Sequence, residues 1–204
     1  MTVGWTRGVI RGGEFPPAPR TVIKVGGSLL TRPMWPDELR ALLVDRAGPT
    51  AIVVGGGPVV DGLRAIDAAS PRPAHVMHRL AVEAMAITAR LVAEATALPL
   101  VAEPVWHEPA AVVLDAALWL APPGRHDCLP VGWQVTSDSI AALVAAGGTA
   151  ALVLVKSVPP SAAHDNLASL ARAGWVDDHF PVAAASLERI AWAVPSGIIP
   201  TSSR

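Results

Sequence analysis

Short apolar runs rich in β-branched residues alternate with amphipathic segments along much of the chain. The runs Thr21–Val25, Thr50–Val54 and 149–155 have the length and composition of buried strands. Segments with helical spacing follow the first two runs and open at Pro36 and Pro58, because proline fits the first turn of a helix. This alternation of strands and helices predicts a parallel α/β sheet.

Further helices are predicted from the spacing of apolar residues. The helix that opens at Pro58 is expected to bury its apolar side (Val59, Val60, Leu63 and Ile66). A second helix begins at Thr136 or Ser137, either of which can cap it. Short strands are expected at Leu100–Val101 and 112–114, and a last helix and strand are expected after residue 167.

The longest predicted helix covers residues 75–97. Its charged residues share one face, since their spacings are four, seven and four: Arg79, Glu83, Arg90 and Glu94. The remaining surface is apolar and wider than a single contact with a sheet requires. We interpret it as a helix that packs on the sheet and also meets a second subunit, in a homodimer or larger homo-oligomer.

Composition limits the class of protein. Apolar residues make up 51% of the 204 residues and charged residues 16%, which suits one domain with a large core. The net charge of −1 argues against a nucleic-acid partner. Cys128 is the only cysteine, so an internal disulfide is excluded and a reducing compartment is favoured.

The ends of the chain and its longest apolar run bear on location. Residues 1–20 lack the apolar core of a signal peptide, and their glycines and prolines predict an irregular N-terminal extension before a single domain over 21–204. The apolar run 140–155 is divided by two glycines, which indicates a buried helix and a buried strand and not a membrane span. We therefore expect a cytoplasmic protein without membrane contact.

Groups that bind phosphate follow three of the predicted strands. They are Lys24 with Gly26-Gly27-Ser28, then Gly55-Gly56-Gly57, then Lys156, and a predicted helix places Asp138 nearby. In an open parallel sheet, ligands bind outside the carboxyl ends of the strands. Cations, backbone N–H groups and a carboxylate that positions a metal or a lysine are what phosphoryl transfer requires.

Each of these features also has a simpler structural interpretation. Glycine pairs after strands are usually turns, Lys156 alone suits an exposed strand end, and Asp138 alone suits the dipole at a helix start. The chain has no Walker A signature, so a P-loop enzyme is rejected. Its histidines, acids and cysteine lack the spacing of a protein-only metal site. The argument therefore depends on the groups occurring together.

Three motifs carry a family resemblance, in the expected order between residues 21 and 158. Lys24-Val-Gly26-Gly27-Ser28, Gly55-Gly56-Gly57-Pro58 and Asp138-Ser-Ile-Ala141 resemble the signatures of the amino acid kinase superfamily. Its members include acetylglutamate kinase, uridylate kinase and isopentenyl phosphate kinase. The resemblance implies a three-layer αβα sandwich with a mostly parallel sheet of about eight strands.

Three further stretches resemble a subgroup of that superfamily. They begin at Trp133 (Trp-Gln-Val-Thr-Ser-Asp-Ser-Ile-Ala-Ala), at Leu154 (Leu-Val-Lys-Ser-Val) and at Gly174 (Gly-Trp-Val-Asp-Asp-His-Phe-Pro). These are similar to the small aminomethylfuran phosphate kinases of methanofuran biosynthesis and their relatives in bacterial one-carbon metabolism. The resemblance implies an ATP-dependent kinase whose acceptor is a phosphate or, less readily, a carboxylate.

The resemblance also implies roles for individual residues. Lys24 and Lys156 would stabilise the phosphoryl groups, and Asp138 would orient the two lysines. ATP, with Mg²⁺ held on its phosphates, would be bound by Gly26, Gly27, Ser28, Ser137, Lys156 and Ser157. The acceptor would be bound by Gly55, Gly56, Gly57, Asp61, His78, Trp133 and Thr136.

One stretch departs from the family pattern. Where many members have an Asp-Gly turn after the last lysine, this chain has Val158-Pro159-Pro160. Prolines remove backbone donors and stiffen the loop that would meet the nucleotide. This keeps a second hypothesis open, that the protein binds a nucleotide or anion, or serves in assembly, without turnover.

Overall fold

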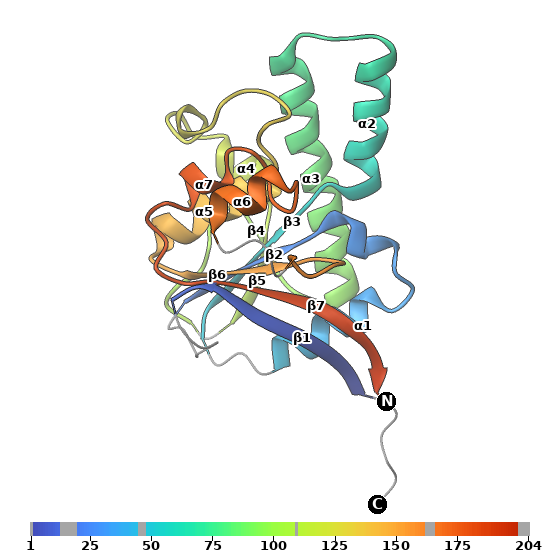
Figure 1. The fold of residues 1–204 in the computed structure, drawn as a ribbon, viewed down its shortest axis with the longest axis vertical. Coiled ribbons are helices and arrows are strands. Elements are labelled where there is room, and N and C mark those ends of the chain that lie inside the picture. Colours follow the sequence, from blue (N-terminus) through green and yellow to red (C-terminus); the bar gives the residue numbers. More distant parts are fainter. Residues whose placement is uncertain (1, 13–19, 45–47, 109, 162–165, 200–204) are drawn as a thin grey trace, which may run out of the picture.

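One seven-stranded sheet organises the described part of the chain (Figure 1). The computed structural model describes residues 2–12, 20–44, 48–108, 110–161 and 166–199. Only β1 runs antiparallel to its neighbour; the other described pairings are parallel. From one edge to the other, the strands are β1 (Thr2–Arg11), β7 (Ile190–Ile199), β6 (Ala151–Val155), β2 (Thr21–Val25), β3 (Thr50–Val54), β5 (Ala111–Leu114) and β4 (Leu100–Val101).

The central strands are buried on both faces, which explains their continuous apolar runs. On one face, Val22 and Leu152 pack in a core with α5 (Ser137–Gly148), α6 (Leu167–Arg172) and α7 (Phe180–Ala183). On the other, Ile23 and Ile52 pack with α1 (Trp35–Val44) and part of α3 (Ala74–Thr96). The sheet thus lies between two helical layers. The α/β architecture with a mostly parallel sheet is confirmed, with seven strands in the described residues where about eight were expected.

The longer helices follow the predicted order closely, whereas the short helices α4 and α7 and the two 3-10 helices were not predicted. None of the helices in the described ranges is long and apolar enough to cross a membrane. Their bounds are η1 (Gly27–Thr31), α1 (Trp35–Val44), α2 (Gly57–Ala69), α3 (Ala74–Thr96), α4 (Ala116–Leu120), η2 (His126–Cys128), α5 (Ser137–Gly148), α6 (Leu167–Arg172) and α7 (Phe180–Ala183).

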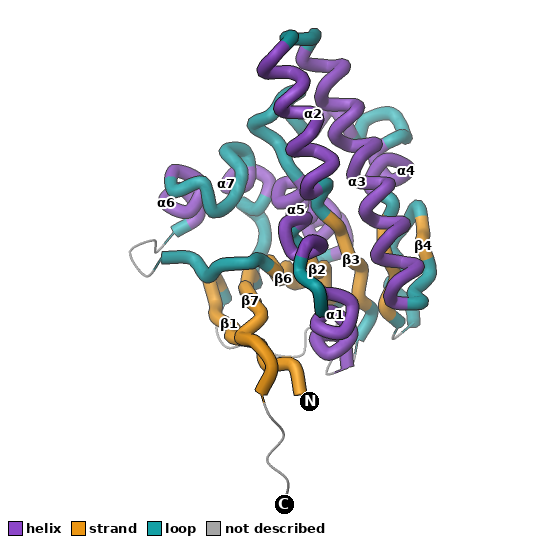
Figure 2. Tube along the Cα trace, turned by 90° about the vertical axis from the view of Figure 1, so that its right-hand side faces the viewer, coloured by secondary structure: helices purple, strands orange, loops and turns teal. Residues whose placement is uncertain are grey.

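The prediction that α2 buries its apolar side is wrong. Every residue of this helix, all of it within the described ranges, is at least partly exposed, and Val59 and Ile66 are 41% and 59% exposed. Figure 2 shows α2 and α3 side by side and rising beyond the sheet. Periodicity indicates which face of a helix is apolar, but it does not show whether another element covers that face.

The irregular extension predicted for residues 1–20 is also wrong where the structure describes it, because Thr2–Arg11 forms β1. The glycines that suggested irregularity have a role in this strand. A Cβ added to Gly8 would lie 2.4 Å from the indole of Trp192, so the glycine makes room for that ring. Arg11 then donates to the carbonyls of Ala184 and Leu187. Residues 13–19 lie outside the described ranges.

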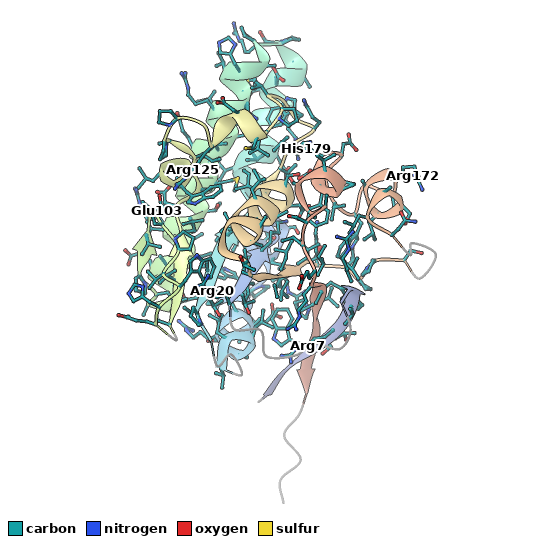
Figure 3. The ribbon with its side chains drawn as sticks, turned by 90° about the vertical axis from the view of Figure 1, so that its left-hand side faces the viewer. Arg7, Arg20, Glu103, Arg125, Arg172 and His179 are labelled. Carbon is teal, nitrogen blue, oxygen red and sulfur yellow. The ribbon has the colours of Figure 1, made fainter. Side chains whose placement is uncertain are left out.

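The segment between β4 and α5 was the hardest to predict. Both expected short strands are present, as β4 and β5. Arg125 holds the loop after β5 and α4 in place: it donates to the Glu103 carboxylate at 2.7 Å and to the Trp119 carbonyl at 2.6 Å. Figure 3 labels Arg125 and Glu103, which lie near each other. The loop then leads into residues 130–136, which reach the candidate site.

Candidate functional site

The carboxyl ends of β2, β3 and β6 lie next to each other at the same level of the sheet. In the register, Val25 is opposite both Val54 and Val155, so the three following loops begin side by side. The Gly26 N–H donates to the Val155 carbonyl at 2.8 Å, and the Gly55 N–H donates to the Val25 carbonyl at 2.9 Å. These bonds extend the pairing of the sheet into the glycine loops.

The two glycine loops contact each other through their backbones. A Cβ added to Gly27 would lie 2.1 Å from the Gly57 nitrogen and 2.6 Å from the Gly55 carbonyl oxygen. Gly57 has a φ of +52°, which a residue with a side chain rarely adopts. Glycine is therefore required here by packing, and the result is a close contact between two largely buried stretches of backbone beside Lys24.

A buried carboxylate lies between the two predicted lysines. Asp138 is 3.0 Å from the Lys24 ammonium and 2.7 Å from the Lys156 ammonium. The Lys24 and Asp138 side chains are almost fully buried, and that of Lys156 is 15% exposed. Lys24 is the next-to-last residue of β2, Asp138 lies in the first turn of α5, and Lys156 directly follows β6. Three segments distant in the sequence thus form one charged group.

The charges in this group shift one another's ionisation. Burial, and then the neighbouring charge of Lys24, lower the pKa of Lys156 to about 8, although Asp138 opposes the shift. Burial alone would raise the pKa of Asp138, but the charges of Lys24 and Lys156 outweigh it and lower that pKa. At neutral pH the group therefore holds two cations and one anion, with a net positive charge.

Asp177 holds the start of α5, and the sequence analysis assigned it no role. Its carboxylate accepts from the Thr136 N–H at 2.9 Å, from the Thr136 hydroxyl at 2.7 Å and from the Ser139 N–H at 3.0 Å, as well as from the Ser139 hydroxyl. Thr136 in turn accepts from the Asp138 N–H at 3.3 Å, as the predicted N-cap. The position of Asp138 therefore depends on a residue about forty positions later.

Trp175 contacts Lys156 and was also not assigned a role. The Lys156 ammonium donates to the Trp175 carbonyl and lies 5.0 Å from the centre of its ring. The indole N–H of Trp175 donates to the Val158 carbonyl at 3.0 Å. Both Trp175 and Asp177 belong to the Gly174-Trp-Val-Asp-Asp stretch. The sequence showed that this stretch resembles the family, but it did not show which groups these two residues contact.

A cavity of about 220 Å³ opens beside the glycine loops. Apolar side chains from α3 and α5, such as Met85 and Ile140, form part of its wall. The residues predicted to bind the acceptor all line it: Gly55, Gly56, Gly57, Asp61, His78, Trp133 and Thr136. Gly27, Ser28 and Ser137, predicted to bind nucleotide, line it as well, so the two predicted sites adjoin.

Trp133 closes one side of this cavity and is fixed to α2. Its indole N–H donates to the Asp67 carboxylate at 2.8 Å, and this hydrogen bond lowers the pKa of Asp67. Arg64, which the sequence analysis missed, lies 5.1 Å from the centre of the Trp133 ring and 3.4 Å from Asp61. His78 reaches the backbone of Gly132 at 3.4 Å. Arg64 and Asp61 thus place a cation and an anion at this side of the cavity, beside the flat ring of Trp133.

Hydroxyl groups from two neighbouring loops could bind one phosphate ligand. Ser28 and Ser157 approach to 3.4 Å between their hydroxyl oxygens, so the β2 and β6 loops can offer donors to one ligand. No group of three or more histidine, cysteine or acidic side chains within the described ranges could hold a metal ion. Asp138 is already paired with two lysines.

Comparisons with known proteins identify the family. The sequence pattern of the Amino acid kinase family matches residues 19–160, which is more than half of the chain. The chain belongs to the amino acid kinase family. A search of the curated proteins found no match.

Solved structures of kinases are similar to this amino acid kinase family member. UMP kinase from Bacillus anthracis has a TM-score of 0.57 and 14% identity, with 90% of this chain and 98% of that chain covered. UMP kinase from Ureaplasma parvum gives 0.49 and 16%, with 70% and 69% covered. Uridylate kinase from Archaeoglobus fulgidus gives 0.47 and 18%, covering 68% of this chain and 63% of that chain. At these identities, the Bacillus structure supports the fold alone.

Proposed function

We propose that this protein is an ATP-dependent kinase that transfers the γ-phosphoryl group to a small phosphorylated acceptor. One observation carries the proposal: Asp138 is buried between Lys24 and Lys156, directly beside two glycine loops that contact each other. This group is positively charged and preorganised, which is the electrostatic requirement of phosphoryl transfer. Membership of the amino acid kinase family supports a phosphotransferase of this type.

The proposed reaction divides the site into two halves. The phosphates of ATP with Mg²⁺ would be bound by the backbone of Gly26 and Gly27 and by the hydroxyls of Ser28, Ser137 and Ser157. An acceptor oxygen attacks the γ-phosphorus from the cavity side, the bond to the β–γ bridging oxygen breaks, and ADP leaves. Lys24 and Lys156 stabilise the negative charge on the transferred group and on the leaving phosphate.

A phosphate acceptor fits the cavity better than an alcohol. A phosphate oxygen is already ionised at neutral pH, so no general base is needed to remove a proton. The acceptor's phosphate would lie against Gly55–Gly57, and its organic part against Trp133 and the apolar wall that includes Met85. Aminomethylfuran phosphate, in methanofuran-type one-carbon cofactor biosynthesis, is our first candidate because three stretches of the chain resemble the kinases that act on it. Its amine could pair with Asp61. The working form would be a cytoplasmic homo-oligomer.

An ADP-release assay tests the proposal. Aminomethylfuran phosphate, UMP, other organic phosphates and carboxylates are offered with ATP and Mg²⁺, and turnover is expected with a phosphate. Lys24→Ala should abolish turnover while circular dichroism and the melting profile still show a folded protein; retained activity would refute the role of Lys24.

The non-catalytic hypothesis makes a different prediction for the same experiment. It arises from Pro159 and Pro160, which follow Lys156 where donors to nucleotide were expected. An ATP-induced thermal shift without ADP release from any acceptor would favour that hypothesis. If neither turnover nor a thermal shift is seen, the kinase proposal is wrong.

A further inference from the structure

A second cavity, of about 390 Å³, lies at the amino ends of β2, β6 and β7. The residues directly before β2 and β7, Arg20 and Arg189, line it together with Ala151, the first residue of β6. The candidate active site lies at the carboxyl ends of β2 and β6. Both strands have five residues, so at about 3.3 Å per residue the two sites are roughly 16 Å apart. The proposed kinase reaction therefore makes no use of this cavity.

The sheet places the two arginines on either side of β6, which pairs with β2 and with β7. The Ala151 N–H donates to the Arg20 carbonyl at 3.0 Å. The Leu152 N–H donates to the Arg189 carbonyl, also at 3.0 Å. Adjacent strands lie about 4.8 Å apart, so the backbones of the two arginines are roughly 10 Å apart. Between them, Ala150 and Ala151 contribute only methyl groups to the lining of the cavity.

The charged groups of this cavity are mostly cationic. Neither arginine forms an ion pair with another residue in the described ranges. Arg20 is held in place, because it donates to the Gly148 carbonyl at 3.0 Å and lies 5.9 Å from the centre of the Trp106 ring. Arg189 is exposed. Glu188 is the single acid among the described lining residues, so the cations outnumber the anions two to one.

Thr149 lines the cavity in an unfavourable backbone conformation, with a φ of +50°. β-branched residues rarely adopt this left-handed conformation, and glycine is the usual residue directly after a helix. The chain has glycine at positions 147 and 148 but threonine at 149. Ala97 has a similar conformation after α3, but alanine is not β-branched. A conformation that is retained despite its cost points to a role for the threonine side chain.

The opposite rim of the cavity is fixed by β1. The Arg11 guanidinium donates to three carbonyls of the connection between α7 and β7, at 3.1 Å, 3.1 Å and 2.9 Å: Ala184, Ala185 and Leu187. Ser186 and Leu187 of this connection line the cavity. A preformed cavity with a few polar groups on an apolar lining is typical of a site for a small molecule.

We propose that this cavity binds a small organic carboxylate, at a site separate from that of the kinase reaction. The planar guanidinium of Arg189 matches a carboxylate with two parallel hydrogen bonds. The hydroxyls of Thr149 and Ser186 are further donors, and the organic part lies on the alanines. Glu188 disfavours a second anionic group but accepts from a hydroxyl or amino group. The best ligand therefore has one carboxylate and a hydroxyl or amino group.

Nuclear magnetic resonance of the ¹⁵N-labelled full chain tests the proposal with glycerate as the probe. Glycerate should produce saturable shifts of the amides of residues 149–151 and 187–189. The amides of Gly26, Gly27 and Gly56 report on the candidate active site in the same spectra. No nucleotide or acceptor is added, so the result does not depend on the proposed kinase activity. Glycerol 3-phosphate, succinate and sodium chloride are titrated for comparison.

Two variants and a control identify the groups that bind the probe. Arg189→Ala should weaken glycerate binding by at least about tenfold, because it removes a charge-assisted pair. Arg172→Ala removes an exposed arginine on α6 and should bind as wild type does. Thr149→Gly should raise the melting temperature by about 2–4 °C, because the left-handed strain is relieved, and should also weaken binding. Circular dichroism checks that each variant is folded.

Several outcomes would overturn the proposal. The cavity is not a carboxylate site if glycerate shifts only the glycine-loop amides, or if sodium chloride reproduces the shifts. Tighter binding of glycerol 3-phosphate or succinate than of glycerate contradicts the ligand class. A folded Arg189→Ala that binds glycerate as wild type does shows that Arg189 is not part of the site. The same result for Thr149→Gly removes the role assigned to Thr149.

Discussion

Replacing Asp138 by asparagine tests whether the buried charges behave as one group. The substitution keeps the shape of the side chain but removes the anion that lies 3.0 Å from Lys24 and 2.7 Å from Lys156. Removing one partner of a buried ion pair typically costs about 3–5 kcal/mol, because the remaining charge is left without compensation. Since domains are stable by only about 5–15 kcal/mol, Asp138→Asn should lose a large part of the free energy of unfolding.

The loss of unfolding free energy in Asp138→Asn, relative to wild type, should also depend on pH. Asp138 raises the pKa of Lys156, so its loss lowers that pKa below the wild-type value of about 8. A folded state that binds fewer protons than the unfolded state gains stability as the pH rises. In the variant this gain begins below pH 8, whereas the wild type gains from Lys156 only above about pH 8. The difference between the two proteins should therefore shrink as the pH rises toward 8.

Urea unfolding of both proteins at several pH values measures this. Asp37→Asn is the matched control, since Asp37 pairs with Arg40 at 2.7 Å but both side chains are at least half exposed. Such a surface pair contributes about 0–1 kcal/mol, so the control should change little. If Asp138→Asn is as stable as the control, or if its deficit does not vary between neutral pH and 8, the charges do not form one buried group and our reasoning about the site fails.

Three other changes give separate tests. In wild type, kcat/KM should fall as the pH rises past about 8, because neutral Lys156 cannot stabilise phosphate charge. A folded Lys156→Arg variant should not show that fall. If its pH profile of kcat/KM is the same as that of wild type, the role assigned to Lys156 is wrong. Asp177→Asn should lower the melting temperature and reduce kcat more than it raises the KM for ATP, because about 1.5–3 kcal/mol is lost per charged hydrogen bond that positions Asp138; an equal effect on both constants argues against positioning. Gly27→Ala should destabilise the protein by more than about 2 kcal/mol, since its Cβ would lie 2.1 Å from the Gly57 nitrogen. The control Gly62→Ala, with open space around the added Cβ, should be neutral or stabilise by about 0.5–1 kcal/mol. Similar melting temperatures for the two alanine variants would refute the close approach of the loops.

The central sheet could be predicted because its signals are local. Thr21–Val25 and Thr50–Val54 are continuous β-branched runs that end in glycines, and the structure has strands with these bounds. The long helix could be predicted for the same reason, since its charged residues, from Arg79 to Glu94, stay on one face over about four turns. Features determined within one segment of the chain are thus readable from that segment.

Other features depend on contacts between distant segments, and these were missed. β1 was read as part of an irregular extension because residues 1–20 contain several glycines and prolines, yet the need for glycine at position 8 comes from Trp192, far along the chain. The same limit applies at the site. Asp177 is one of two adjacent acids after a turn, and nothing in the sequence distinguishes the one that caps α5 from Asp178, which is exposed.

Trp175 changes what Pro159 and Pro160 imply for the nucleotide. The prolines lack N–H donors, so a loop built on them cannot hold phosphates through its backbone as an Asp-Gly turn would. Trp175 fixes the residue before them, because its indole donates to the Val158 carbonyl, and its own carbonyl accepts from Lys156. Lys156 is therefore positioned by Trp175, through its backbone carbonyl and its ring, from the α6–α7 connection. A rigid loop and a correctly placed Lys156 are compatible, and so the two prolines alone are weak evidence against turnover.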